Sequence, residues 1–303
     1  MKQFATGVVV LTAIWWYVHR GAPPVVPSET TEDRPAKTAV NNLDATAERS
    51  SAPTRTANSN SAQPLPSPAK PRLTVREQPG RYAHTFTVDA DGIAVIDGDI
   101  ALGVPPPGQD AGLAAVLPLT PWPTHFVPYF IQGDLKNPDR VLEALRMFTN
   151  TAIKFIPYTD QQDVLVFQEA EGACKSYVGK VGGKQSIWIS EKCGPHEIAH
   201  ELMHALGFIH EQNRFDRDAF IKINPDSIDE KYKINFDKMP REFMQLSGLA
   251  EFSFDSIMIY PPTMFSRNAL ATMSPISENQ RISPSEQLSD RDKDRIDRFY
   301  GTR

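Results

Sequence analysis

Residues 200–211, HELMHALGFIHE, decide the fold of this chain. His200 and His204 are four positions apart, so on a helix both imidazoles project from one face, one turn apart. Two imidazoles at this spacing can bind one Zn²⁺, and Glu201 between them is placed to take a proton from a metal-bound water. The stretch therefore predicts a helix that carries a zinc site.

The second half of the stretch supplies a third ligand. Gly207 lets the chain leave the helix through a left-handed conformation, which residues with a Cβ resist, so we assign it a structural role. The turned chain can then bring His210 to the metal. Three protein ligands plus water are typical of a catalytic zinc site, whereas a structural site fills its fourth position with protein. We predict one Zn²⁺ per chain, bound by His200, His204 and His210.

An overlapping H-E-x-x-H frame begins at His196 and ends at His200. Only the frame that begins at His200 is followed by a glycine and a third histidine at a spacing that lets the third histidine reach the metal. With a helix that starts near Pro195, His196 lies in the first turn, on the same face as the ligands. We interpret it as a residue at the rim of the site, with contact to the metal in some state as the alternative.

Two further stretches carry a resemblance to a known family. QNRFDRD follows at residues 212–218 after Glu211, and SIMIY stands at residues 256–260. Together with the histidine motif they closely resemble the astacin family of metzincin zinc endopeptidases, whose third histidine is followed by Glu and then R-x-D-R-D, and whose later turn reads S-x-M-H-Y. Shorter matches extend the resemblance over about residues 116–303: Trp122-Pro123, Val127-Pro128-Tyr129, GACKSYVGKVGGKQ at 172–185, and Leu288-Ser289 to Phe299-Tyr300.

This resemblance implies a role for each residue of the motifs. The three histidines bind zinc, and Glu201 is the general base and acid. Met258 forms a hydrophobic floor beneath the metal, and Tyr260 is a metal ligand at rest that moves away to stabilise the oxyanion. Glu211 contacts the mature N-terminus after activation, which implies a structural role. The alternative for Met258 and Tyr260 is that both are ordinary core residues.

The chain departs from the family pattern at two points. Ile259 stands where the family usually has His, which leaves the ligands intact but changes the packing of the turn. The family domain usually has four cysteines in two disulfides, and this chain has two, Cys174 and Cys193, which match the shorter bridge. The pair is compatible with one disulfide in an exported protein, and two unpaired buried thiols are the alternative.

The N-terminus predicts export. Residues 1–22 contain an uncharged run from Phe4 to Val18, which suits a signal peptide and is short for a membrane-spanning helix. Two outcomes stay open: a cleaved signal peptide and a secreted protein, or an uncleaved signal anchor and an extracytoplasmic protein tethered to the membrane. Residues 23–80 are rich in Pro, Ser, Thr and Ala with few large apolar residues, and predict a disordered tether.

Residues 81–115 predict a propeptide segment. Gly92 to Ile100 has the pattern of a strand that ends in a tight turn. Residues 96–100, IDGDI, are similar to the F-x-G-D motif of astacin propeptides, in which the Asp caps the zinc and keeps the enzyme latent. A carboxylate can fill the open metal position, so Asp99 is a candidate latency switch. A plain hairpin turn, in which Asp-Gly is common, is the alternative.

Residues 116–303 predict an α+β domain of metzincin type: a twisted mixed sheet, a zinc helix over 195–207, a C-terminal helix and a loop-rich lower half. The other expected elements are a helix after Asn137-Pro138, strands at 127–131, 153–157, 164–168, 176–181 and 186–190, a short helix near 227–237, and a final helix that starts at Ser289 and Asp292.

These patterns predict an exported, zinc-dependent endopeptidase made as a proenzyme, with protein or peptide substrates. A net charge of −5, scattered along the chain, gives no reason to expect a nucleic-acid partner. The rival class is a catalytically silent zinc-binding module for surface interactions, whose signature would be the loss of Glu201 or Tyr260. A zinc hydrolase that acts on other bonds is a further alternative.

Overall fold

The computed structural model describes residues 83–108, 111–115, 119–243 and 251–302. The predicted signal segment 1–22 and tether 23–80 lie outside the described residues, and the propeptide segment 81–115 is described in part. Within these ranges, none of the helices has the length and apolar character that a membrane crossing needs.

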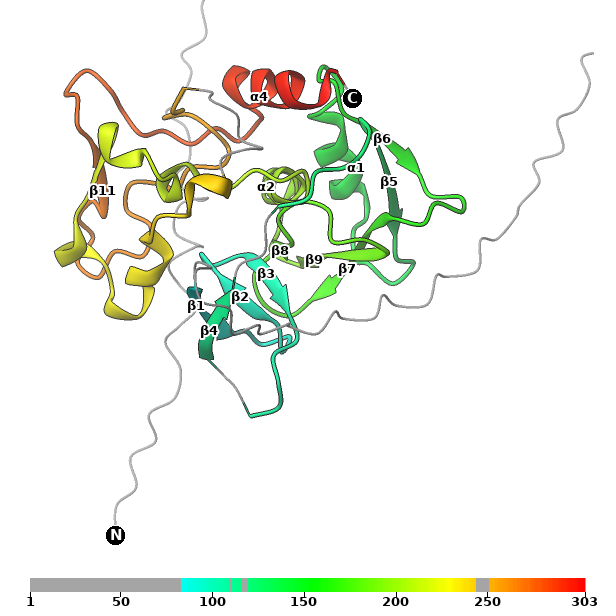
Figure 1. Cartoon of the computed structure of the whole chain (residues 1–303), viewed down its shortest axis with the longest axis horizontal. Helices are drawn as coiled ribbons and strands as arrows, with labels where there is room; N and C mark the ends of the chain where they lie inside the picture. The colour runs from blue at the N-terminus through cyan, green and yellow to red at the C-terminus, as the bar shows by residue number, and fades with distance from the viewer. Residues whose placement is uncertain (1–82, 109–110, 116–118, 244–250, 303) are drawn as a thin grey trace, which may run out of the picture. The chain divides into compact units, whose positions relative to one another are not determined.

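A mixed sheet forms one layer of the structure (Figure 1). In the described part it has nine strands in the order β4-β1-β2-β3-β8-β9-β7-β5-β6. The strands are β1 Ala83–Val88, β2 Ala94–Ile96, β3 Ile100–Gly103, β4 Ala111–Ala115, β5 Phe126–Ile131, β6 Lys154–Pro157, β7 Val164–Ala170, β8 Lys175–Ser176 and β9 Lys184–Ser190. The parallel strands β7 and β9 are buried on both faces, which explains their nearly continuous apolar sequences.

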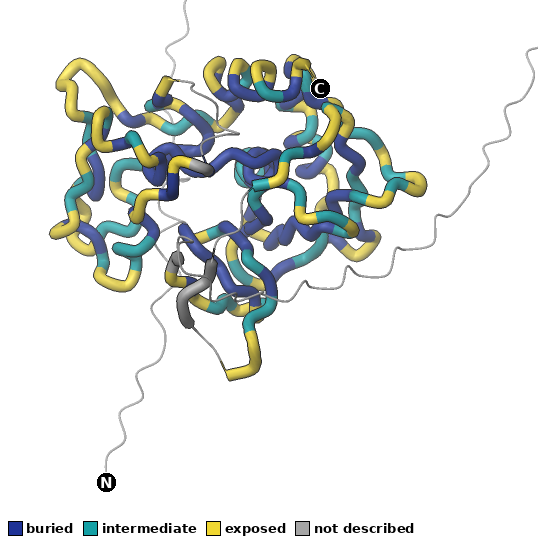
Figure 2. Tube along the Cα trace, viewed as in Figure 1, coloured by how far each residue is buried: buried dark blue, intermediate teal, exposed yellow. Residues whose placement is uncertain are grey.

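Among the described residues, α1 Asp139–Arg146, α2 Pro195–Ala205 and α4 Asp290–Tyr300 complete the sheet half. They share one core with the sheet, and the dark blue trace of Figure 2 marks how fully α2 is enclosed. Representative members are Val141 and Phe148 of the α1 region, Leu165, Phe167, Ile187 and Ile189 of the sheet, Ile198 and Leu202 of α2, and Ile296 and Tyr300 of α4. The histidine helix is therefore the central element of the core.

Two aromatic side chains fix the end of α2. The last carbonyls of a helix have no partner within the helix. Trp122 donates its indole N–H to the carbonyl of Ala205 at 3.0 Å, and the Tyr300 hydroxyl donates to that of Leu206 at 2.6 Å. The turn that leads to His210 thus starts from a helix end whose carbonyls are satisfied.

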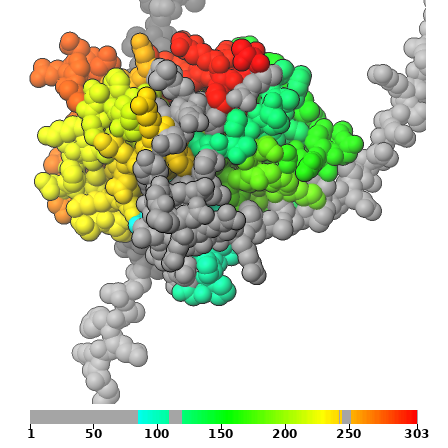
Figure 3. Space-filling view, in the orientation of Figure 1, coloured from blue at the N-terminus to red at the C-terminus, as the bar shows by residue number. Residues whose placement is uncertain are grey.

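The chain between α2 and α4 is mostly irregular and forms the other half of the domain. Its regular parts are 3-10 helices at Glu211–Asn213, Arg217–Ala219, Pro225–Ser227, Glu230–Phe236 and Arg241–Phe243, and the paired strands β10 Ile221–Ile223 and β11 Met273–Pro275. It has a core of its own, which includes Phe236, Ile259 and Met273. In Figure 3 this half, yellow to orange, and the green sheet half lie on opposite sides of the visible face.

Most expected elements are present, with shifts of one or two residues at their ends. The strand expected at 176–181 is wrong beyond Ser176. There the chain turns: Gly179 has a φ of 74°, its N–H donates to the carbonyl of His204, and the N–H of Lys180 donates to that of Thr120. These bonds replace a strand ladder. The helix after Asn137 begins one residue later than expected, with Pro138 at the N-cap position.

The N-terminal segment forms a hairpin. The strand expected from Gly92 ends in a tight turn, as predicted: β2 stops at Ile96, and Asp97 and Gly98 have φ values of 52° and 89°. Two central residues with positive φ are typical of the tight turns for which Asp-Gly is favoured. The hairpin β2–β3 then continues the sheet, because Ile100 pairs in parallel with Ser176 of β8.

The predicted disulfide between Cys174 and Cys193 is present, with the two Cα atoms 6.3 Å apart. It joins the residue before β8 to the residue two positions before α2. We expect the double variant Cys174→Ala/Cys193→Ala to lose about 3 kcal/mol in the free energy of unfolding, since the bridge closes a loop of about 19 residues. Urea denaturation measures this. The wild type in excess reductant is the control and should unfold at the variant's midpoint; an unchanged midpoint in the variant would contradict the expectation.

Candidate metal centre

Helix α2 presents two histidines with fixed orientations. The Nδ1 atom of His200 lies 2.8 Å from the carbonyl oxygen of Ile257, and that of His204 lies 2.8 Å from the carbonyl oxygen of Phe208. A carbonyl accepts only, so each Nδ1 carries the proton and donates it. In the neutral form of each ring, Nε2 is therefore the acceptor, and this is the form that binds a metal.

Gly207 turns the chain toward the third histidine. Its φ is 105°, and its N–H donates to the carbonyl of His204 at 2.7 Å while Phe208 N–H reaches back to Met203. A residue with a Cβ is strained at this φ. The turn brings His210 to the helix face, with its Nε2 3.1 Å from that of His200.

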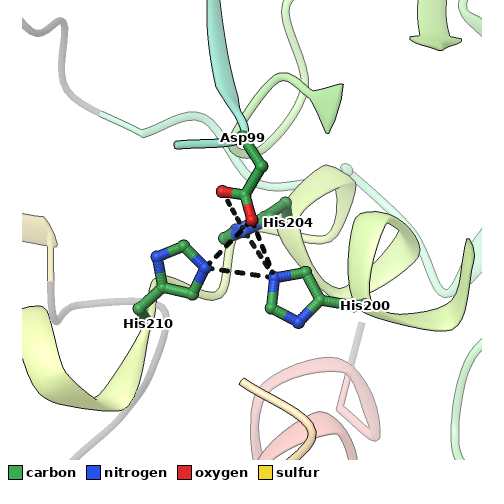
Figure 4. Close-up of side chains that lie close together, drawn as sticks. All are labelled: Asp99, His200, His204 and His210. Atoms are coloured by element: carbon green, nitrogen blue, oxygen red, sulfur yellow. Dashed lines mark hydrogen bonds and ion pairs between the residues drawn. The ribbon is translucent and has the colours of Figure 1, made fainter. Parts of the chain in front are cut away.

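The ligand atoms converge on one point (Figure 4). The Nε2 atoms of His204 and His210 each lie 3.1 Å from that of His200, and carboxylate oxygens of Asp99 lie 3.3–3.4 Å from the three nitrogens. Four tetrahedral ligands about 2.0–2.1 Å from Zn²⁺ are separated by roughly 3.3 Å. Acceptor nitrogens that face one another at this distance repel unless a cation lies between them, so these residues fit zinc.

Charge and burial shape the protonation of this cluster. Burial lowers the pKa of His204 to about 4 and also lowers that of His210, which favours the neutral ring. Burial acts in the same sense on His200, but the adjacent Asp99 raises the pKa of that ring to about 9, so a metal that binds there must displace its Nε2 proton. Burial opposes the charge of Asp99 too, yet the surrounding histidines hold the pKa of its carboxyl well below the usual range.

Glu201 is buried beside the cluster at 2% exposure. Within the described part of the chain, its Oε2 atom has no hydrogen-bond partner. Burial, reinforced by the charge of Asp99, raises the pKa of Glu201 well above its usual value. Its main-chain carbonyl accepts a 2.8 Å hydrogen bond from the Ser176 hydroxyl, which joins α2 to β8 at this point.

Asp99 reaches the histidines from the hairpin β2–β3. Its main-chain carbonyl accepts a hydrogen bond from the N–H of Ser176 at 3.2 Å. The sequence allows two interpretations of Asp99: a residue of a plain hairpin turn, or a carboxylate that caps the metal. The geometry contains both features, because the Asp97–Gly98 turn directs the next side chain to the three imidazoles.

The turn at residues 256–260 lies against the histidines. Met258 is fully buried, and its carbonyl accepts a hydrogen bond from Glu211 N–H at 2.9 Å. The ring of Tyr260 lies 4.8 Å from that of His210, centroid to centroid. Its hydroxyl donates to the main-chain carbonyl of Asp97. Ile259 packs in the loop-rich core.

Glu211 is buried in a network that holds the loop after His210. Its carboxylate forms ion pairs with Arg295 of α4 and with Arg214, the latter at 3.2 Å, and accepts the N–H of Ser253 at 3.0 Å. Buried carboxylates are tolerated when they are paired and hydrogen-bonded in this way. The network anchors the third histidine's loop to the C-terminal helix.

His196 does not join the ligand group. Its side chain is 45% exposed, and its Nδ1 lies 3.0 Å from a carboxylate oxygen of Glu197, on the first turn of α2. The interpretation as a rim residue agrees with this placement.

Sequence reasoning missed Asp292 as a support of the site. Besides capping α4 through Ser289, its buried carboxylate accepts the Ser256 hydroxyl at 2.5 Å and the Ile257 N–H at 3.0 Å. Ile257 in turn accepts from His200. The capping-box pattern identified the helix start, but nothing in the sequence indicated the contact across 35 residues.

The mixed sheet, the histidine helix and the convergent third histidine define an α+β domain built around a metal site of metzincin type. The chain belongs to the astacin family of peptidases, whose family model matches residues 115–301. The predicted family and fold class are thereby confirmed.

Individual relatives agree with this membership. Zinc metalloproteinase nas-14 of Caenorhabditis elegans is 36% identical over 186 residues, which are 59% of this chain and 37% of that protein. Tolloid-like protein 2 of Homo sapiens is 37% identical over 54% of this chain and 17% of its own length. The chain thus spans well under two thirds of these relatives.

A solved structure is also similar. It is high choriolytic enzyme 1, a hatching enzyme zinc-protease from Oryzias latipes, with a TM-score of 0.54 and 30% identity. The match covers 61% of this chain and 94% of that one. The predicted cofactor, one zinc per chain, agrees with these relatives and with the four converging side chains.

We expect His204→Ala to abolish tight zinc binding, because it removes one of the three nitrogens that converge on the metal. The zinc content of the purified, dialysed protein, measured by plasma mass spectrometry, should fall from about one per chain to near zero. His196→Ala is the matched control, as it removes a histidine of the same helix outside the cluster and should keep its zinc. A His204→Ala protein that retained stoichiometric zinc would place the metal elsewhere.

Proposed function

We propose that this chain is a zinc-dependent endopeptidase that hydrolyses peptide bonds in proteins. The observation that carries the proposal is the convergence of three imidazole Nε2 atoms beside a buried glutamate on the same helix. Membership of a peptidase family and the names of the relatives support it. The alternative of a silent zinc-binding module has no support from the site, since Glu201 and Tyr260 are both retained.

His200, His204 and His210 would hold the zinc. Bound zinc lowers the pKa of a coordinated water to about 7 and polarises a carbonyl oxygen. Glu201 accepts the proton of the attacking water and then delivers it to the departing amide nitrogen. Burial raises the pKa of this carboxyl and so moves it in the direction that suits a group which must both accept and deliver a proton.

Tyr260 stabilises the substrate carbonyl oxygen as negative charge develops on it. A fixed hydroxyl donor near that oxygen lowers the barrier without reorganisation of solvent. The hydroxyl is bonded here to Asp97 of the N-terminal hairpin, so departure of the hairpin would free this donor for the substrate. Met258 supports the histidines from below, and Glu211 holds the loop of the third histidine.

The N-terminal segment keeps the protein latent, in our proposal. Asp99 fills the position that a water or a substrate carbonyl needs, and β3 occupies the edge of β8 next to it. Activation then requires removal of residues up to about the end of the 81–115 segment. Export to an oxidising compartment, through the 1–22 segment and with or without a lasting membrane tether, is consistent with the Cys174–Cys193 disulfide.

We expect Glu201→Gln to lower kcat/KM for a denatured protein substrate by at least about a hundredfold, because it removes the proton acceptor and leaves the zinc ligands intact. The rate is measured on full chain processed by limited proteolysis, together with its zinc content. Glu197→Gln, on the preceding turn of α2, is the matched control and should cleave at the wild-type rate. Normal cleavage by Glu201→Gln would exclude this residue from the mechanism.

We expect Asp99→Asn to raise the activity of the unprocessed chain at least several-fold, since a neutral amide binds a metal more weakly than a carboxylate does. Initial rates on a quenched fluorescent peptide, recorded before any processing is visible on a gel, measure the effect. Asp160→Asn, at an exposed position between β6 and β7, is the control and should leave the unprocessed chain inactive. Equal latency of the Asp99 variant and the wild type would leave Asp99 as a turn residue only.

A further inference from the structure

The three histidines of the metal centre differ in what holds their second ring nitrogen. The Nδ1 of His204 donates to the carbonyl of Phe208, and the Nδ1 of His210 is buried with no hydrogen-bond partner among the described residues. The Nδ1 of His200 donates to the carbonyl of Ile257 at 2.8 Å. An outer partner on this nitrogen fixes the orientation of a ligating ring and raises its basicity. The groups that lie behind Ile257 therefore bear on the metal.

The main-chain amide that joins Ile257 to Met258 carries the next link. Its carbonyl accepts from His200, and its N–H, on Met258, donates to the hydroxyl oxygen of Ser256 at 3.0 Å. Both groups belong to one conjugated amide, so a hydrogen bond donated by the N–H increases the negative charge on the carbonyl oxygen. The bond to Ser256 therefore strengthens the bond to His200.

The Ser256 hydroxyl extends this series to the C-terminal helix. It accepts from Met258 and donates to the Oδ1 of Asp292 at 2.5 Å. A hydroxyl has one proton, so this proton points to α4 and the lone pairs remain for the turn. All the hydrogen bonds then run in the same sense, from the imidazole to a carboxylate. We refer to the four groups, the His200 ring, the Ile257–Met258 amide, the Ser256 hydroxyl and the Asp292 carboxylate, as the relay.

The surroundings of Asp292 suit an ionised carboxylate at the end of the relay. Besides Ser256, the described residues give its Oδ2 three donors at 2.9–3.0 Å, which are the N–H of Ile257 and the N–H and hydroxyl of Ser289. Burial raises the pKa of Asp292, and these bonds together with the charge of Arg295 oppose the rise. A charged carboxylate only accepts, so four donors match this form. Its negative charge draws the protons of the relay toward α4.

The relay is enclosed by protein. Ser256, Met258 and Asp292 are fully buried, and Ile257 is 4% exposed. In a buried environment each hydrogen bond is electrostatically stronger than in water, and a chain of bonds of one sense reinforces its members by about 10–30% per bond. The charge of Asp292 can therefore act on the His200 ring through the intervening groups.

We propose that Ser256 and Asp292 are positioning residues of the zinc centre, which act through the Nδ1 proton of His200 and make this ring a stronger zinc ligand. The inference concerns how the metal is held, so its test does not depend on the proposed peptidase activity. Its competitor is a structural role alone, in which Asp292 caps α4 and anchors the turn while Ser256 only shapes that turn.

Two serine variants separate the relay from the cap. Ser256→Ala interrupts the relay and leaves Asp292 bonded to the N–H of Ile257 and to Ser289. Ser289→Ala is the matched control, because it removes a hydroxyl bonded to the same carboxylate and leaves the relay intact. Zinc dissociation constants of the full chain are measured by competition with a chelator, under conditions in which circular dichroism shows each variant folded. We expect Ser256→Ala to weaken zinc binding about tenfold, and Ser289→Ala to leave it unchanged.

Nuclear magnetic resonance of the zinc-bound chain, labelled at histidine, observes the ring directly. Ser256→Ala should shift the Nδ1 proton resonance of His200 upfield, because a proton in a weaker hydrogen bond is less deshielded. The corresponding proton of His204, which is bonded outside the relay, should not move, and Ser289→Ala should move neither. A structural role alone does not produce a change confined to His200, so equal shifts of both rings in Ser256→Ala would overturn the proposal.

Asp292→Asn and its combination with Ser256→Ala test whether the two side chains act in series. Both changes interrupt the same relay, so the double variant should bind zinc no more weakly than Asp292→Asn alone. Additive losses would indicate two independent supports and overturn the proposal. Unchanged zinc affinity in Ser256→Ala, or an equal loss in Ser289→Ala, would do the same. If Asp292→Asn does not fold, the comparison of the two serine variants decides.

Discussion

Three converging imidazole acceptors, with those of His204 and His210 each 3.1 Å from that of His200, are the constraint on which this structure depends. Their arrangement is unfavourable without a cation, so the surrounding protein must hold it in advance. Two of the rings are oriented by carbonyl groups, from Ile257 and Phe208, that lie outside α2. Both carbonyls sit in irregular chain, and the packing of that chain therefore decides the geometry of the metal site.

Buried charges of the C-terminal helix supply this packing. Asp292 holds the turn that contains Ile257, and Arg295 holds Glu211, one residue after the third histidine. Hydrogen bonds and opposite charges offset part of the cost of burying these charges, and the contacts restrict the loops. The irregular half of the domain is thus held at two points of α4, one turn apart. Through these contacts the helix positions the loops that carry the metal site.

The histidine stretch and the helix caps could be predicted from the sequence because their physics is local: spacing of four on a helix, a glycine at positive φ, a capping box at Ser289. The contacts of Asp292 with Ile257 and of Lys175 with Asp89 could not, because each joins residues 35 to 86 positions apart with no pattern between them. The strand expected at 176–181 failed beyond its first residue for a related reason. Its amides are within reach of partners distant in sequence, and the carbonyls of Thr120 and His204 compete successfully for them.

The N-terminal segment is bound by far more than the Asp99 carboxylate. Its strands extend the sheet, and Phe86, Ile96 and Ile100 share a core with Ile209, which precedes the third histidine. Burial of several large apolar side chains contributes about 1.5–3 kcal/mol each, a contribution that does not depend on the Asp99 carboxylate. The affinity of the segment therefore resides in the sheet and the core, and Asp99 mainly sets which atoms lie over the metal. This explains how a common type of hairpin turn can position the Asp99 carboxylate accurately. The register of β3 on β8 fixes the position of the turn, and the turn fixes the position of the carboxylate.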